Sequence, residues 1–475
     1  MALSKQRRSE AVVGEFANVS LGDERLDRRL ETIVTQIAAA PGESFPLQMR
    51  STAEREALYR FLGNQKVTMT ALLASHVSET LSRVRGQRLV RVVHDTTEFV
   101  FEGDREGLGI VERGMQGFFG HFALAVGVGE QRETFGVLGL QPYIHHDTKA
   151  RRKKNRTERT TFIRSLPRHK KKSSRWESLA REVSASLPEA VEAIHVMDQE
   201  ADDFALLATL HESKLRFVVR GSTKRLAESH GRSIEEFLST RPAKVFRTVR
   251  LNRRSYRKAQ GRHVPRDERK ARLCLRWAQL TLPRPRYGQT EIKELRVNAV
   301  HVFERNPPSD AERIEWLLLT SEPVNSLEDA TTIVDHYRAR WVVEEYFKAL
   351  KTGCGFEKRQ LTSYAALLRA LALFVPIAWH LLALRELSRT SDSTPALHLF
   401  DEEQLHLLRV LLEQRRHELP DKPSVRQAML GIAALGGHIR NNGDPGWMVL
   451  GRGYQRFTDA EGLWRLARPK RSDQS

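Results

Sequence analysis

One stretch of the chain, residues 337–351, combines cations, aromatic rings and acids at helical spacing. Read at about 100° per residue, it brings six side chains within an arc of about 100°: Tyr337, Arg340, Trp341, Glu344, Lys348 and Lys351. A solvated helix face is the simpler interpretation of such a pattern. Here, however, a carboxylate lies among groups that bind phosphate, which is the arrangement that a metal-dependent phosphodiester enzyme needs.

Two aspartates elsewhere in the chain could complete a metal site with Glu344. Asp95 follows the β-branched run 89–93, and Asp198 directly ends the apolar run 193–197. Single aspartates at strand ends usually serve as caps or turns. Phosphodiester hydrolysis with two divalent ions, in contrast, requires several carboxylates that hold the ions roughly 3.5–4 Å apart. The sequence therefore predicts that these three carboxylates lie together.

Acidic neighbours of these three residues are weaker candidates. Asp202 and Asp203 suit the start of the helix that follows, because carboxylates are stabilised near a helix N-terminus. Glu345 lies off the centre of the helix face that carries Glu344. The helix itself is expected to start at the capping-box spacing of 326–329, and Gly353 is a suitable stop.

The spacing Tyr337-x2-Arg340-x3-Glu344-x6-Lys351 resembles the YREK signature of insertion-sequence DDE transposases, bacterial enzymes that cut and paste DNA. All four residues match the signature in type and spacing. The resemblance extends over nearly the whole chain and is strongest in five runs: 89–98, 194–203, 215–220, 316–324 and 335–359.

The resemblance implies specific roles for these residues. Asp95, Asp198 and Glu344 would be catalytic and would bind two Mg²⁺ ions per active site, with Mn²⁺ able to substitute. In the family, the tryptophan that matches Trp316 stacks on a base flipped out of the duplex; a core tryptophan is the alternative interpretation. The expected DNA contacts are Arg220, Trp316, Tyr337, Arg340, Trp341, Lys348 and Lys351.

The composition is consistent with a nucleic-acid partner. Lysine and arginine number 78 against 59 aspartates and glutamates, a net charge of +19. Such an excess favours nucleic acid first and an anionic membrane surface second. The membrane interpretation is weak, because the most apolar run, 365–384, is interrupted by Arg369, Pro376 and His380 and is predicted to form a buried pair of helices.

The two cysteines, Cys274 and Cys354, form no metal-ligand pattern. We therefore expect a reduced cytosolic protein without disulfides or zinc. With the resemblance, this implies a bacterial, cytoplasmic, nucleoid-associated protein.

The order of predicted elements favours an α/β fold. From residue 89 to 220 the patterns follow the order β-β-β-α-β-α-β, and the helix at 337–351 completes the order of a ribonuclease-H-like domain. A dense basic loop at 149–175 has no assigned role. Arg25, Arg28 and Arg29 are candidates for DNA-end recognition, with a solvated basic surface as the alternative.

Five segments are expected, and the functions of the first and last rest on the resemblance. They are an N-terminal helical DNA-end-binding domain (1–75), the first part of the ribonuclease-H-like catalytic domain (76–220), a β-rich insertion (221–323), the final helices of the catalytic domain (324–375) and a C-terminal helical dimerisation region (376–475). A plain C-terminal cap on the core is the alternative for the last segment.

The expected function is that of a cut-and-paste DNA transposase. It would bind the terminal inverted repeats of its element as a homodimer on double-stranded DNA, excise the element through a hairpin intermediate, and join the 3′-OH ends to target DNA. One alternative is an inactive DNA-binding inhibitor of the same fold, although such a protein has no need of an intact metal triad. Another is a ribonuclease-H-like nuclease without strand transfer.

Overall fold

The structure is a computed structural model of the 475-residue chain. It describes residues 12–111, 114–129, 131–144, 158, 165–168, 171, 173–227, 231–251, 253, 267–286, 289–309, 311–390, 393–439 and 444–467. The basic loop expected at 149–175 lies largely outside the described residues.

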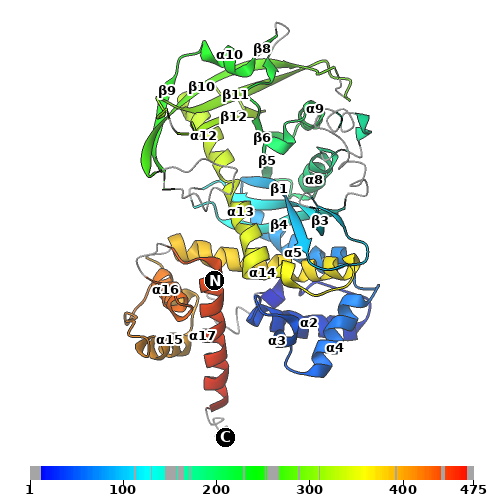
Figure 1. The fold of residues 1–475 in the computed structure, drawn as a ribbon, viewed down its shortest axis with the longest axis vertical. Helices are drawn as coiled ribbons and strands as arrows, with labels where there is room; N and C mark the ends of the chain where they lie inside the picture. Colours follow the sequence, from blue (N-terminus) through cyan, green and yellow to red (C-terminus); the bar gives the residue numbers. More distant parts are fainter. Residues whose placement is uncertain are drawn as a thin grey trace.

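A mixed sheet of ten strands forms the centre of the molecule (Figure 1). Along the sheet the order is β2-β3-β1-β5-β6-β12-β11-β10-β9, and β4 pairs with β3. The strands are β1 (Leu89–Phe101), β2 (Gly109–Ile110), β3 (Gln116–Gly127), β4 (Thr134–Tyr143), β5 (Glu192–Met197), β6 (Arg216–Gly221), β9 (Lys244–Leu251), β10 (Arg269–Pro283), β11 (Glu294–Glu304) and β12 (Glu315–Thr320).

Three parallel strands bring the predicted site residues to one edge of the sheet. Strand β5 pairs in parallel with both β1 and β6, so their carboxyl ends point the same way. Asp95 was expected at a strand end, but it lies inside β1. The parallel pairing of β1 with β5 stops at Val93, whereas the antiparallel pairing with β3 continues to Phe101. Asp95 is therefore just beyond the last residue that β5 pairs with.

The strands of the expected insertion extend the central sheet. Strand β12 pairs antiparallel with β6, and β11, β10 and β9 follow in antiparallel order. The sequence predicts strand runs here at 245–251, 271–282, 293–303 and 316–320. They agree with the observed strands to within about two residues, a normal uncertainty for element ends. A short helix, α10 (Ile234–Ser239), and the small hairpin of β7 (Leu226–Ala227) and β8 (Arg232–Ser233) were not predicted.

Helices cover both faces of the sheet because its central strands are apolar on both sides. Neighbouring residues of β1 belong to different cores: Val92 packs in the core that includes Leu179 of α8 (Ser173–Ser186), and Val93 in the core that includes Tyr346 of α13 (Trp341–Lys348). Helix α9 (Phe204–Glu212) packs on β6. The structure is thus a mixed α/β fold, and its ribonuclease-H-like assignment stays a prediction.

The N-terminal part is helical, as expected, but it extends further. Helices α2 (Glu24–Ala39), α3 (Phe45–Gln48) and α4 (Thr52–Gly63) are followed by α5 (Met69–Val84), which the sequence analysis did not predict. Helix α5 packs against β4 and α14. Buried strands supply the partner for its apolar side, so α5 covers the sheet rather than extending the N-terminal helices.

The apolar run at 365–384 forms one helix, not the expected pair. Helix α14 (Tyr364–Thr390) continues through Pro376. Proline inside a helix costs about 3 kcal/mol. Burying a large apolar side chain fully stabilises the fold by about 1.5–3 kcal/mol. Leu373, Phe374 and Val375 are all fully buried, so their burial offsets the cost of the proline. Tyr364–Glu386 has the length and apolarity of a membrane span, but 72% of its most apolar window lies inside the protein.

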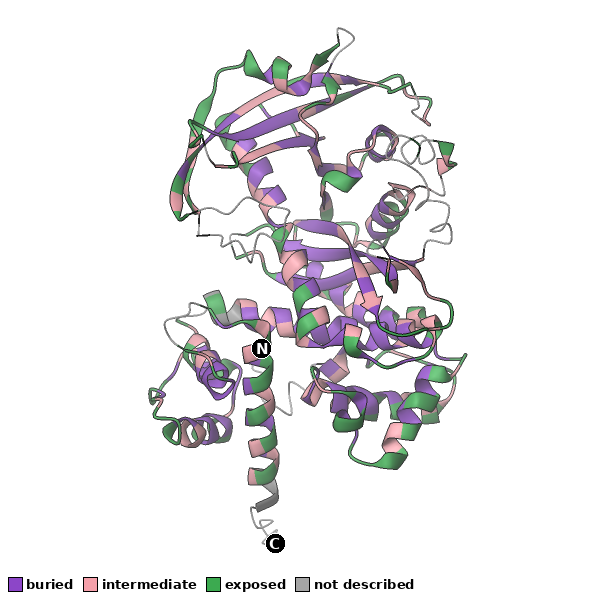
Figure 2. Cartoon of the chain, viewed as in Figure 1, coloured by how far each residue is buried: buried purple, intermediate pink, exposed green. Residues whose placement is uncertain are grey.

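The C-terminal part forms a separate small core from α15 (Glu402–Glu413), α16 (Val425–Leu435) and α17 (Trp447–Ala467). In Figure 1 these helices and the N-terminal ones both lie beneath the sheet. Buried residues fill the central strands and α14, whereas much of α17 is exposed or half-buried (Figure 2).

Candidate active site

The expected helix through 337–351 is divided in two. Helix α12 (Leu327–Arg338) starts at the predicted capping box, in which Ser326 accepts from the Asp329 N–H and the Asp329 carboxylate accepts from the Ser326 N–H. It ends at Arg338, and α13 begins at Trp341. The N–H of Arg340 bonds to the carbonyl of Tyr337, the tighter spacing that is common at helix ends. The chain then passes through a π-turn at Ala349–Gly353.

Tyr337 is more deeply buried than the other three signature residues, which are half-buried. It is only 2% exposed and packs edge-on against Trp316, with ring centroids 5.6 Å apart. Burial raises the pKa of its hydroxyl, and the nearby positive charges of Arg340 and Arg220 oppose that shift. Tyr337 thus packs in the main core, and its role as a DNA contact stays a prediction.

Arg340 links two of the predicted carboxylates. Its Nη1 lies 2.9 Å from Oδ2 of Asp95 and its Nη2 lies 2.6 Å from Oε1 of Glu344. The other carboxylate oxygen of Asp95 accepts from the N–H of Thr96 at 2.8 Å. Asp95 and Glu344, far apart in the sequence, are therefore held together by one buried guanidinium.

Asp198 lies close to this pair. It caps the short 3-10 turn Gln199–Ala201 by accepting from the Glu200 N–H at 2.8 Å. Burial, together with the negative charge of Asp198, raises the pKa of Asp95 to about 7. Arg340 opposes this rise. The three acids are thus within electrostatic range of one another around Arg340.

The acidic neighbours that were set aside have other partners. Asp202 pairs with Arg225 at 2.5 Å, and Asp203 caps α9 by accepting from the Leu206 N–H. Glu345 pairs with Arg385 and with Lys348, the latter at 3.0 Å.

Two family models match the chain. A model described as a transposase DNA-binding domain matches residues 8–67, and one described as a transposase DDE domain matches residues 152–375. The chain carries the DNA-binding domain and the DDE domain of a transposase. The DDE match includes Asp198 and Glu344 and begins after Asp95. The prediction of a DNA-binding transposase is confirmed at this level, and membership of the YREK group stays a prediction.

A solved structure also aligns with the transposase. It is the cryo-EM structure of a piggyBac transposase synaptic complex with hairpin DNA, with 12% identity over 97% of this chain and 82% of that chain, at a TM-score of 0.33. A similarity this low carries no argument about fold or mechanism.

The residues expected to contact DNA divide into two groups in the transposase. Tyr337 lies near Arg340, and Arg220, near the end of β6, is close enough to influence the pKa of the Tyr337 hydroxyl. Trp316, near the start of β12, packs against the Tyr337 ring. Trp341 is 50% exposed, with the Arg340 guanidinium 5.3 Å from its ring centroid.

The remaining expected DNA contacts are less closely tied to this site. Lys351 donates to the carbonyl of Glu98 and lies 3.5 Å from Glu357, so protein groups engage it. Lys348 is exposed and pairs with Glu345. In the N-terminal domain, Arg25 and Arg28 pair with Asp23 and Glu24, and Arg29 is exposed.

The carboxylates of the transposase suit a hard divalent cation but are not gathered around one point. Among the described residues, no group of three acids, histidines or cysteines is placed to hold a metal ion. The donors are nevertheless all oxygens, the set that Mg²⁺ and Mn²⁺ prefer. A positive guanidinium already lies between two of them. The residues therefore fit a divalent metal, which DDE transposases use, provided that Arg340 moves.

Sequence analysis missed a buried histidine network behind the site. Nε2 of His94 lies 2.9 Å from Nδ1 of His195. The other ring nitrogen of His195, Nε2, lies 2.8 Å from the hydroxyl of Ser184. Burial lowers the pKa of His195 to about 4, so it stays neutral near pH 7. The network joins β1 and β5 one residue before Asp95. The signal was present, because His94 directly precedes Asp95 and His195 lies in the apolar run before Asp198.

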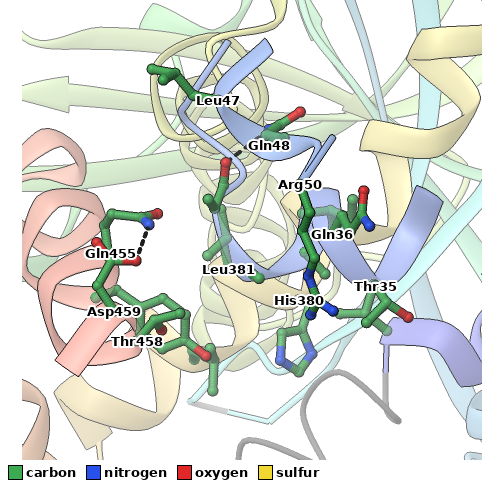
Figure 3. A pocket seen from close by; sticks show the side chains of 17 residues that line it. Thr35, Gln36, Leu47, Gln48, Arg50, His380, Leu381, Gln455, Thr458 and Asp459 are labelled. Carbon is green, nitrogen blue, oxygen red and sulfur yellow. Dashed lines mark hydrogen bonds between the residues drawn. The ribbon is translucent and has the colours of Figure 1, made fainter. Parts of the chain in front are cut away.

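A separate cavity lies where α2, α3, α14 and α17 meet (Figure 3). Thr35 and Gln36 of α2, Gln48 at the end of α3 and Thr458 of α17 line it. Among the described residues that line this cavity, none is a predicted site residue. It is therefore distinct from the carboxylate site of the transposase.

Proposed function

We propose that this DDE transposase excises an insertion sequence by cutting and pasting it, with Asp95, Asp198 and Glu344 as its catalytic carboxylates. The observation that carries the proposal is the Arg340 bridge between Asp95 and Glu344, with Asp198 close enough to shift the pKa of Asp95. Three acids from distant parts of a ribonuclease-H-like fold would thus share one site. Such proximity of like charges is costly unless cations are bound there.

In the proposed mechanism the three carboxylates would hold two Mg²⁺ ions, which Mn²⁺ could replace. When bound, such ions stabilise the leaving oxygen and activate water or a 3′-OH as the nucleophile. Hydrolysis of one strand leaves a 3′-OH, which attacks the opposite strand to form a hairpin. Water reopens the hairpin, and the free 3′-OH then attacks target DNA.

The basic and aromatic residues position the DNA in this proposal. Arg340 and Arg220 bind phosphates near the cut, because a guanidinium can contact two phosphate oxygens at once. Trp316 offers a ring for the base that leaves the stack when the hairpin forms. The N-terminal domain binds the terminal repeats, and two copies of the chain pair two ends in the bacterial cytoplasm, at the nucleoid.

The two alternatives differ from this proposal in their products. An inactive inhibitor would bind ends without cutting them, and a simple nuclease would cut without forming hairpins or joining ends. The carboxylate site favours a catalyst over an inhibitor, since DNA binding alone gives no reason to bring acids together against their mutual repulsion.

The test is to incubate the full-length protein with duplexes that carry the element's ends and Mg²⁺, and to separate the products on denaturing gels. We expect 3′-OH nicks, then hairpins, then joined products. Glu344→Gln should bind the ends but not cut them. Glu328→Gln, an exposed position on α12, is the matched control and should cut normally. Cleavage by Glu344→Gln at the wild-type rate would refute the assignment.

A further inference from the structure

Arg340 occupies the oxygens that a metal would need. Of the two carboxylate oxygens of Asp95, one accepts from Arg340 at 2.9 Å and the other from the N–H of Thr96 at 2.8 Å. One oxygen of Glu344 accepts from the same guanidinium at 2.6 Å. A divalent ion bound by Asp95 and Glu344 would meet a positive group already between them. Metal binding therefore requires that Arg340 give up at least one of these contacts.

We propose that Arg340 couples DNA binding to metal binding: without DNA it holds Asp95 and Glu344 in place of a divalent ion, and a DNA phosphate draws it away so that the ion can bind. This inference rests on the proposed function, because it takes these carboxylates as the metal ligands. It also gives the order of binding: the DNA end binds first, and the divalent ion binds to the carboxylates afterwards.

Arg340 has a hydrogen-bond donor that could bind a DNA phosphate. Its Nε is buried and makes no hydrogen bond with the described residues, so this guanidinium has a donor left over. A phosphate presents several acceptor oxygens and can pair with a guanidinium in a two-pronged contact. When the Arg340 guanidinium moves from the carboxylates to a phosphate, it therefore exchanges charge-assisted hydrogen bonds for others of the same kind.

The position of Arg340 in the chain also suits movement. It lies between the end of α12 and the start of α13, where the regular helical hydrogen bonds are replaced by shorter-range ones. Its side chain can therefore change direction without unwinding a helix interior. Trp341, the next residue, is half exposed, lies beside the guanidinium and is itself an expected DNA contact.

Thermodynamic linkage turns this exchange into a measurable coupling. If DNA raises the affinity for metal by some factor, metal must raise the affinity for DNA by the same factor. Coupling of this kind is typically about 5- to 150-fold. Removing the guanidinium should release the metal site in the absence of DNA and abolish most of the coupling.

The experiment measures Mn²⁺ binding by electron paramagnetic resonance, with and without a duplex that carries the element's end. The full-length wild type should bind Mn²⁺ at least about 5-fold more tightly when DNA is present. Arg340→Gln should bind Mn²⁺ alone at least about 5-fold more tightly than the wild type does alone, and DNA should change its affinity less than about 2-fold.

Arg338→Gln is the matched control for a general charge effect. Arg338 lies two residues before Arg340 and pairs with Asp335 at 2.9 Å, so its loss removes one positive charge without breaking the Arg340 bridge. It should keep the wild-type dependence of Mn²⁺ affinity on DNA. An equal gain in Mn²⁺ affinity in Arg338→Gln and Arg340→Gln would overturn the proposal, and so would undiminished coupling in Arg340→Gln.

Failure of the proposed function gives a different result. Glu344→Gln should lose Mn²⁺ affinity both with and without DNA. Wild-type Mn²⁺ affinity in that variant, or no Mn²⁺ binding in any DNA-bound sample, would reject these carboxylates as the metal site. Normal loss in Glu344→Gln together with DNA-independent Mn²⁺ binding in the wild type would reject only the role of Arg340.

Discussion

Trp316 and Tyr337 lie edge to face, with ring centroids 5.6 Å apart and ring planes at 65°. Trp316 is the second residue of β12 and is half-buried, whereas Tyr337 lies near the end of α12 and is buried. The tyrosine thus supports a tryptophan ring that is still partly accessible. A ring fixed in advance in this way can receive a flipped base with little loss of side-chain entropy.

The first prediction concerns this ring. Trp316→Ala should make the first nick at a near-normal rate but form or open the hairpin about 5- to 150-fold more slowly, because roughly 1–3 kcal/mol of stacking is lost. Product gels over time measure both steps. Trp277→Ala, at a half-buried tryptophan in the same core, controls for lost packing. Hairpins at the wild-type rate would exclude the stacking role, and an unfolded variant would favour a core tryptophan.

The second prediction separates the catalytic aspartates from their neighbours. Asp95→Asn and Asp198→Asn should each abolish cleavage, because the metal site loses charge, while binding to DNA ends persists through the basic residues. Asp203→Asn is the control, since asparagine also caps a helix well and Asp203 serves as the cap of α9. Gel shifts and cleavage assays on the same samples decide it. Loss of cleavage in Asp203→Asn with full activity in Asp198→Asn would exchange their roles.

The third prediction is a pH dependence of stability that arises at Glu386 of α14. Burial raises the pKa of this carboxyl from 4.5 to about 7, although Thr134 donates to it. Between about pH 4.5 and 7 the folded chain keeps a proton here that the unfolded chain has released, so this group lowers the free energy of unfolding as pH rises, and its effect is constant above that range.

Glu386→Gln should remove this loss. Its free energy of unfolding should match that of the wild type near pH 4.5 and exceed it at pH 8 by on the order of 2–4 kcal/mol. Denaturant unfolding of both proteins at the two pH values is the measurement. An identical difference at both pH values would show that the carboxyl does not titrate in this window.

The fourth prediction concerns pairing of two copies through α17. Deleting this helix would expose the core that Leu450 and Phe457 complete, so a surface substitution is the sharper test. Leu463 is 69% exposed. Leu463→Glu should leave folding and single-end binding unchanged but weaken the paired complex by about 10-fold or more, since burying a charge at an interface costs at least about 1.4 kcal/mol.

Native gels and analytical ultracentrifugation with end-bearing duplexes measure that pairing. Leu397→Glu, at another exposed leucine of the C-terminal part, is the control. Paired complexes that form equally well in Leu463→Glu and the wild type would place the dimer contact elsewhere.

Local features of the fold followed from the sequence because their causes are local. The capping box at Ser326 depends on side chains three residues apart. The β3–β4 hairpin and the four strands β9–β12 follow from alternating or β-branched runs bounded by polar segments. The signature spacing around Glu344 and the apolar run before Asp198 likewise selected the site residues before any tertiary contact was known.

Tertiary packing decided the features that local pattern could not. Strand β1 continues past Asp95 because β3 pairs with it there. Helix α14 continues through Pro376 because the apolar residues around that proline are buried. Tyr337 is buried because α12 packs against the main core. The bridge from Arg340 to Asp95 is the clearest case, since 245 residues separate its two ends. Such a contact forms only when the whole sheet has folded and has brought the strand and the helix together. The sequence information for it is therefore distributed over all the strand pairings of the sheet, and no local pattern contains it.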